Sequence, residues 1–157
     1  MARDVDVVTE RVIRRPVDVV AGYAADPANA PEWYANIRSV QWRTPPPVAV
    51  GSRLESVAGF LGRRLVYTYE VAELEAGRRM VMRTADGPFP METTYTWEPT
   101  DDGATRMTLR NRGRPSGFAS IAAPAMAAAM RRANTADLAA LARVLEERGG
   151  TAGAPPG

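Results

Sequence analysis

The chain has 157 residues, of which 45% are hydrophobic and 24% are charged, and its formal net charge is +2. These values are typical of a single globular domain that is large enough to bury a hydrophobic core. The sequence contains no Cys, no His and no Lys, which excludes thiol nucleophiles, disulfides, Ser-His-Asp triads, Schiff bases and the usual zinc and iron sites. We therefore expect no metal and no cofactor, and any catalysis would depend on carboxylates, Tyr, Arg, Ser or Thr.

The basic residues are all Arg, and their pairs are scattered along the chain: Arg14-Arg15, Arg63-Arg64, Arg78-Arg79 and Arg131-Arg132. Proteins that bind nucleic acid usually carry a larger positive excess on one continuous surface, so we expect no nucleic-acid partner. The longest apolar run, Phe118 to Met130, is shorter than the ~20 residues of a membrane span. The N-terminus is polar and lacks a secretion signal, so a cytoplasmic protein without a membrane span is expected.

The N-terminal part of the chain predicts one strand followed by two short helices. Apolar and polar residues alternate from Val5 to Ile13, which is typical of a strand. Pro16 is suited to the start of a helix that continues to Tyr23. Asp26-Pro27 combines an N-cap residue with proline at the first helical position, which predicts a second short helix through Trp33-Tyr34.

The middle of the chain predicts an antiparallel meander, because segments of period two alternate with turn residues. The turns contain Pro45-Pro46-Pro47, Leu61-Gly62, Glu75-Ala76-Gly77, Asp86-Gly87-Pro88 and Asp101-Asp102-Gly103. The expected strands are residues 37–43, 51–60, 63–74, 79–85, 91–98 and 104–112.

The C-terminal part predicts one long helix that ends near Arg148, because Ala, Leu, Met and Arg are frequent there. Its inner face contains Ala123, Ala127, Met130, Asn134, Leu138, Leu141 and Leu145. Asp137 is assigned to the charged residues away from this face. Pro124 belongs either to the first turn or to a kink, and the sequence leaves both open. Gly149-Gly150 is expected to end the helix, with residues 149–157 as a disordered tail.

The order of these elements favours an α+β fold in which a curved, seven-stranded antiparallel sheet grips the long helix. One Ala-rich helix cannot fill such a sheet, so a cavity is expected between them. The chain resembles the START-like, helix-grip (SRPBCC) superfamily, which includes polyketide cyclases/dehydrases and lipid-transfer proteins. The resemblance covers residues 3–148 as one domain and includes Asp26-Pro27 before Trp33, the segment Tyr67-Thr68-Tyr69-Glu70-Val71, and Gly87-Pro88-Phe89-Pro90.

Every second residue of a strand faces the same side of the sheet, so one alternating set from each strand, together with the facing side of the helix, is expected to line this cavity. The candidate ligand-binding residues are Leu54, Phe60, Tyr67, Tyr69, Met80, Met82, Thr93, Tyr95, Trp97, Met107, Leu109, Asn111, Met130 and Asn134. The opposite parity is polar and is expected to face solvent: Glu55, Thr68, Glu70, Arg79, Arg83, Glu92, Thr94, Arg106 and Arg110. For each apolar candidate, plain core packing is the competing interpretation.

Three functions are compatible with these features, and no catalytic residue can be chosen among the candidates. The first is binding or transport of a hydrophobic small molecule, such as a lipid, a polyketide or an aromatic compound, by a monomer or homodimer. The resemblance implies a second, a polyketide aromatase/cyclase or dehydrase that acts in the same cavity. The third is a protein-interaction module of the chaperone-activator type. We favour the first, because the chain lacks the usual catalytic side chains.

Overall fold

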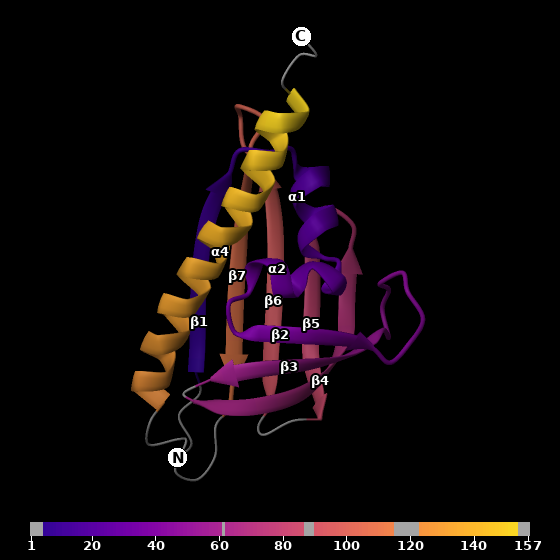
Figure 1. Ribbon diagram of the computed structural model, residues 1–157, viewed down its shortest axis with the longest axis vertical. Helices are drawn as coiled ribbons and strands as arrows, with labels where there is room; N and C mark the ends of the chain where they lie inside the picture. Colours follow the sequence, from indigo (N-terminus) through magenta and orange to yellow (C-terminus); the bar gives the residue numbers. More distant parts are fainter. Residues whose placement is uncertain (1–4, 61, 87–89, 115–122, 154–157) are drawn as a thin grey trace.

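The computed structural model describes residues 5–60, 62–86, 90–114 and 123–153, and only the backbone of residues 60, 86 and 150–153 (Figure 1). The elements in chain order are β1 (Val5–Ile13), α1 (Val17–Ala24), the 3₁₀ helix η1 (Pro27–Asn29), α2 (Ala30–Trp33), β2 (Ile37–Trp42), β3 (Arg53–Phe60), β4 (Arg63–Glu75), β5 (Arg79–Asp86), β6 (Met91–Pro99), β7 (Thr105–Gly113) and α4 (Ala123–Gly153).

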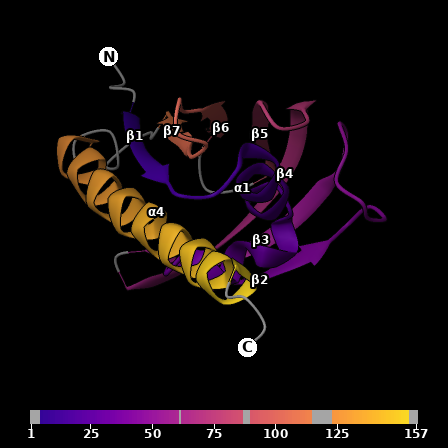
Figure 2. The same cartoon turned by 90° about the horizontal axis from the view of Figure 1, so that it is seen from above.

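The strands form one seven-stranded antiparallel sheet in the order β1-β7-β6-β5-β4-β3-β2. Consecutive strands from β2 to β7 are neighbours, and β7 then pairs with β1 along its whole length, from Val5 opposite Gly113 to Ile13 opposite Thr105. Figure 2 shows the sheet bent around the helices, with α4 crossing the open side of the curve from β1 towards β2. The predicted α+β helix-grip architecture is confirmed.

Local sequence signals explain two tight turns and the start of the second helical segment. Gly62 and Gly77 have φ angles of 76° and 75°, a left-handed conformation that glycine adopts without a steric penalty. The Asp26 carboxylate accepts a hydrogen bond from the Ala28 N–H at 3.0 Å, so it caps η1, which leads into α2. The N-cap prediction is confirmed, although the first turn is 3₁₀ rather than α-helical.

The bounds of α4 place Pro124 in its first turn and differ from the expected end of the helix. Pro124 is the second residue of α4, where its missing N–H removes no helical hydrogen bond. The helix does not end at Gly149-Gly150 but continues to Gly153, and residues 154–157 lie outside the described residues. A glycine in a helix costs about 1 kcal/mol relative to Ala, which weakens the last turns without forbidding them.

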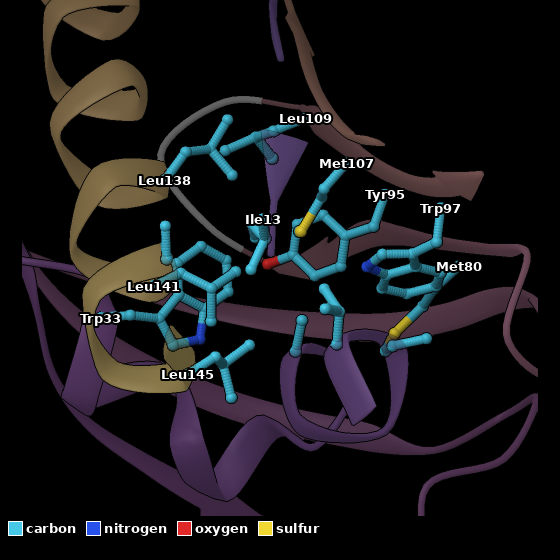
Figure 3. Close-up of a cluster of buried hydrophobic side chains, with 14 of the residues drawn as sticks. Ile13, Trp33, Met80, Tyr95, Trp97, Met107, Leu109, Leu138, Leu141 and Leu145 are labelled. Atoms are coloured by element: carbon cyan, nitrogen blue, oxygen red, sulfur yellow. The ribbon is translucent and has the colours of Figure 1, made fainter. Parts of the chain in front are cut away.

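The main core fills one part of the space between the sheet and the helices (Figure 3). There, Leu138, Leu141 and Leu145 of α4 pack against the sheet, α1 and Trp33 of α2. A smaller cluster joins the start of α4 to β1 and consists of Val5, Val7, Ala123 and Met126. Among the described helices, none is long and apolar enough to cross a membrane.

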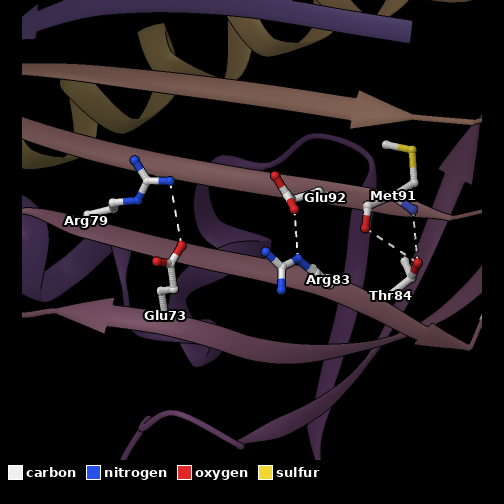
Figure 4. Close-up of polar contacts among 6 residues, drawn as sticks. All are labelled: Glu73, Arg79, Arg83, Thr84, Met91 and Glu92. Carbon is white, nitrogen blue, oxygen red and sulfur yellow. Dashed lines mark hydrogen bonds and ion pairs between the residues drawn. The ribbon is translucent and has the colours of Figure 1, made fainter. Parts of the chain in front are cut away.

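The outer face of the sheet carries ion pairs between neighbouring strands. Arg83 pairs with Glu92 at 2.7 Å and Arg79 with Glu73 at 3.6 Å (Figure 4), which agrees with the predicted solvent-facing parity. Thr94 is the exception, with only 9% of its surface exposed. It lies in the middle of the sheet, directly opposite Val81 on β5 and Arg110 on β7.

Candidate functional site

A cavity of about 180 Å³ lies between α4, the α2 region and the inner face of the sheet. A single water needs about 10–15 Å³ of such space, so the cavity has room for an organic molecule. Its lining is mainly apolar and aromatic. The described lining residues are Ala24, Ala25, Pro27, Ala30, Tyr34, Asn36, Ile37, Val40, Leu54, Ser56, Ala58, Gly59, Leu65, Tyr67, Tyr69, Met80, Met82, Met91, Thr93, Tyr95, Asn111, Met126, Met130, Ala133, Asn134 and Asp137.

Most of the residues predicted from strand parity and helix periodicity lie around this cavity. They are Leu54, Tyr67, Tyr69, Met80, Met82, Thr93, Tyr95, Asn111, Met130 and Asn134. The Phe60 side chain lies outside the described part of the chain. A contact between any of these residues and a ligand stays a prediction.

Three of the predicted residues do not line the cavity. Trp97, Met107 and Leu109 are on the inner face of the sheet, but they are 3%, 0% and 0% exposed and belong to the main core. Figure 3 shows Leu109 next to Leu138 and Trp97 next to Met80. Parity indicated the correct face, but at this end of the sheet α1 and the second half of α4 cover that face, so no space remains.

Met91, Met126 and Met130 line the end of the cavity nearest the start of β1, and parity reasoning missed the first two of them. Met91 precedes Thr93 by two residues on β6 and therefore faces the same side, while Met126 lies one helical turn before Met130. Both signals were present in the sequence. Unbranched thioether side chains adapt to irregular shapes, so this end suits a flexible or variable apolar group.

A tyrosine pair lies at the end of the cavity next to the main core. The Tyr34 and Tyr95 hydroxyl oxygens are 2.6 Å apart, and either can donate the hydrogen bond between them. Burial raises the pKa of both hydroxyls above the ordinary value of 10, and Asp137 adds to both shifts. Their hydrogen bond raises the pKa of Tyr34 further but lowers that of Tyr95. Both phenols are therefore neutral at physiological pH. Tyr95 and Met91 are four residues apart on β6, so the two ends of the cavity are separated by about 13 Å.

Asp137 is the functional candidate that sequence reasoning placed incorrectly. It is 3% exposed and lines the cavity, rather than lying on the charged side of α4. Its Oδ1 accepts a hydrogen bond from the Ala35 N–H at 3.1 Å. Burial raises the pKa of this carboxyl to about 6, although the hydrogen bond from Ala35 acts in the opposite direction.

The spacing of Asp137 along the helix could have revealed its position. It follows Asn134 by three residues and precedes Leu141 by four, and both intervals place side chains on one helix face. The charge of Asp137 favoured a solvent-exposed position, because an isolated aspartate is rarely buried. The Ala35 N–H donates a hydrogen bond to Asp137, and it can do so only because the segment after α2 packs against α4.

The two buried asparagines of the cavity differ in their hydrogen bonds. On the sheet, the Asn111 Oδ1 accepts a hydrogen bond from the Thr93 hydroxyl at 2.7 Å. On α4, Asn134 is 4% exposed, and its Nδ2 has no acceptor among the described residues. Within the same part of the chain, no three acidic side chains form a group that could hold a metal ion.

Solved structures share this fold at low sequence identity. TTHA0849 from Thermus thermophilus matches with a TM-score of 0.79 and 19% identity, over 91% of this chain and 98% of that chain. The Zhui aromatase/cyclase from Streptomyces sp. R1128 matches with a TM-score of 0.77 and 18% identity, over 93% and 96%. A START superfamily protein from Mycobacterium smegmatis matches with a TM-score of 0.67 and 15% identity, over 91% and 95%. At these identities the likeness shows the fold alone.

The family relationship rests on a match over nearly the whole chain. No curated protein matches significantly. The family model described as polyketide cyclase/dehydrase and lipid transport matches residues 4–146, which include the sheet and most of α4. The chain therefore belongs to the polyketide cyclase/dehydrase and lipid transport family.

Proposed function

We propose that the protein binds an apolar small molecule in the cavity between the sheet and α4 and acts as its carrier. The observation that carries this proposal is the lining, in which methionine, tyrosine and aliphatic side chains surround a space that the core leaves unfilled. Such a surface favours an apolar ligand, because burial removes roughly 25 cal/mol of unfavourable hydration per Å². The family name, which includes lipid transport, supports the same class of ligand.

A neutral fluorescent probe, N-phenyl-1-naphthylamine, tests this proposal in a titration of the purified protein. We expect enhanced probe emission that saturates at one probe per chain. Met130→Trp should abolish the binding, because Met130 lines the cavity and an indole at this position fills it.

The matched control is Arg131→Trp, which places the same indole on the exposed side of the same helix turn. This variant should bind the probe like the wild type. Unchanged probe affinity in a folded Met130→Trp variant would overturn the proposed location of the site.

A cyclase or dehydrase is the second candidate function, and the buried Asp137 specifically favours it. In its ionised form, this carboxylate can remove a proton from a carbon atom between two carbonyl groups. The products of that step are a protonated Asp137 and an enolate, whose oxygen can accept a hydrogen bond from the neutral Tyr34 or Tyr95 hydroxyl. The shape of the cavity would then hold the ligand in one orientation, which selects the two carbon atoms between which a bond forms.

Turnover of a soluble poly-ketone mimic separates the two candidates. An enzyme that uses Asp137 as a base should show a rate that rises with pH around a midpoint of about 6. Asp137→Asn should abolish the rate and leave probe binding intact. Binding of the mimic without any turnover in the wild type would favour the carrier.

A further inference from the structure

Asn134 has an unused hydrogen-bond donor in a cavity that is otherwise mainly apolar. Its side chain lies on the cavity face of α4, only 4% of the residue is exposed, and no described residue accepts a hydrogen bond from its Nδ2. A buried polar group without a partner is unfavourable by about 1–3 kcal/mol, so native structures usually provide a partner. The indole N–H groups of Trp33 and Trp97 also lack partners among the described residues, but neither residue lines the cavity.

The tyrosine pair adds a second donor to the lining of the same cavity. A hydrogen bond between two hydroxyls uses the proton of one and leaves the proton of the other available. Tyr34 and Tyr95 form such a pair, and no further hydrogen bond of either hydroxyl is found among the described residues. Their raised pKa values keep both protons in place at physiological pH.

The nearby charge restricts which acceptor can approach these donors. Asp137 lies one turn after Asn134 on the same helix face, and it is mainly ionised above a pH of about 6. No arginine is present among the described lining residues to neutralise a second anion. A ligand carboxylate would therefore meet a like charge in a poorly solvated space, whereas a carbonyl oxygen would not.

We propose that Asn134 is a specificity-determining residue, whose Nδ2 donates a hydrogen bond to a carbonyl oxygen of a neutral, otherwise apolar ligand. This inference rests on the proposed binding function and narrows it to ketones, quinones, esters and similar oxygenated compounds. The carbonyl group lies beside Asn134, and the apolar body contacts the apolar and aromatic side chains of the remaining lining.

Three probes with one naphthalene skeleton test the proposal by isothermal titration calorimetry at pH 8. They are 2-acetylnaphthalene, 2-ethylnaphthalene and 2-naphthoate, which carry a ketone, a hydrocarbon and a carboxylate group. Since a hydrogen bond contributes about 1–1.5 kcal/mol, the wild type should bind the ketone roughly five- to tenfold more tightly than the hydrocarbon. It should bind the carboxylate most weakly.

Asn134→Leu removes the donor, keeps the branched shape and the number of non-hydrogen side-chain atoms, and should abolish the preference for the ketone. The affinity of 2-ethylnaphthalene should be retained, which shows that the variant is folded and its cavity intact. Thr135→Leu is the matched control, because it replaces an exposed polar residue on the same helix and should keep the preference. If Asn134→Leu fails to fold, Asn134→Ala is measured in the same way.

The carbonyl stretching frequency of labelled 2-acetylnaphthalene gives a second readout that a purely structural role would not change. It should decrease on binding to the wild type and decrease less in Asn134→Leu. Equal affinities of the ketone and hydrocarbon in the wild type, or a preference that survives in Asn134→Leu, would overturn the role of Asn134 and leave the binding function standing. Absence of binding by all three probes would instead count against the proposed function itself.

Discussion

At the scale of single residues, the buried polar side chains of the cavity are the candidates for a functional role. Asp137 is the buried carboxyl of the cavity lining, and it shares its helix face with Asn134, whose donor is unused among the described residues. The tyrosine pair provides neutral hydroxyls. A chain without His and Cys therefore obtains a group that titrates near neutrality by burying an aspartate rather than through residue type.

Asp137→Asn should change the pH dependence of stability. The pKa of Asp137 rises from 3.8 in the unfolded chain to about 6 in the folded protein, so the folded state binds its proton more tightly. The wild type consequently loses stability as the pH rises between these values, and the loss persists at higher pH. The Asn variant does not carry this penalty, and its Oδ1 can still accept the hydrogen bond from Ala35.

Urea denaturation at pH 4.5 and pH 8 measures this effect. The free energy of unfolding of Asp137→Asn minus that of the wild type should be about 2 kcal/mol larger at pH 8 than at pH 4.5, because the variant is relatively more stable at the higher pH. Asn134→Leu, one turn away, serves as a control that leaves the carboxyl in place. The same difference between wild type and Asp137→Asn at both pH values would contradict the raised pKa.

At the scale of secondary structure, α4 has two parts with different roles. Its first half borders the cavity with Met126 and Met130, while its second half packs Leu138, Leu141 and Leu145 into the main core. Beyond the leucines, the Leu145 carbonyl oxygen accepts a hydrogen bond from the Arg15 Nη1 at 2.7 Å. The second half therefore fixes the helix on the sheet, and the first half can form one wall of the cavity.

Truncation of α4 should separate these roles. A chain that ends after Arg148 keeps the core leucines and the contact of Arg148 with the Tyr23 ring, 5.0 Å from its centroid. We expect its free energy of unfolding to change by less than about 1 kcal/mol. A chain that ends after Asp137 loses Leu138, Leu141 and Leu145.

The second truncation should unfold the domain. Each leucine contributes about 1.5–3 kcal/mol when fully buried, and a domain is stable by only about 5–15 kcal/mol in total. Circular dichroism during thermal denaturation measures both chains. A cooperative transition in the chain that ends after Asp137 would contradict the assigned role of the second half of α4.

At the scale of the whole molecule, the cavity follows from the geometry of one helix crossing a strongly curved sheet. The helix extends across the open side of the curve (Figure 2). The main core fills the part nearest α1 and the second half of α4, and a smaller cluster lies between the start of α4 and β1. The unfilled part has a mainly apolar surface. A ligand that occupies it binds the folded state alone and should therefore stabilise the entire domain.

Ligand binding should raise the melting temperature. At a free ligand concentration of 100 times Kd, stabilisation amounts to about 2.7 kcal/mol, which corresponds to roughly 5–10 °C for a domain of this size. Differential scanning calorimetry with 2-acetylnaphthalene measures the shift. Met130→Trp, with its filled cavity, should show no shift, and an equal shift in both proteins would indicate binding elsewhere.

Sequence patterns were sufficient to predict the order of the elements and the inner face of β3 to β7. Alternation placed Tyr95 and Trp97 on the same side of β6, and the structure agrees. Turn residues indicated where strands end, and Asp26 indicated where the second helical segment begins. These features depend on neighbours a few residues apart, so a single chain displays them directly.

The division of the sheet's inner face into core and cavity depends on how the helices pack against it, which local sequence patterns do not show. Tyr95 lines the cavity, whereas Trp97 is enclosed in the core, because the helices cover one end of the strand and not the other. Likewise, Asp137 is buried because the segment that contains Ala35 packs against α4 and provides a hydrogen bond. Both outcomes depend on contacts between residues far apart in the chain, which periodicity along one strand or helix cannot report.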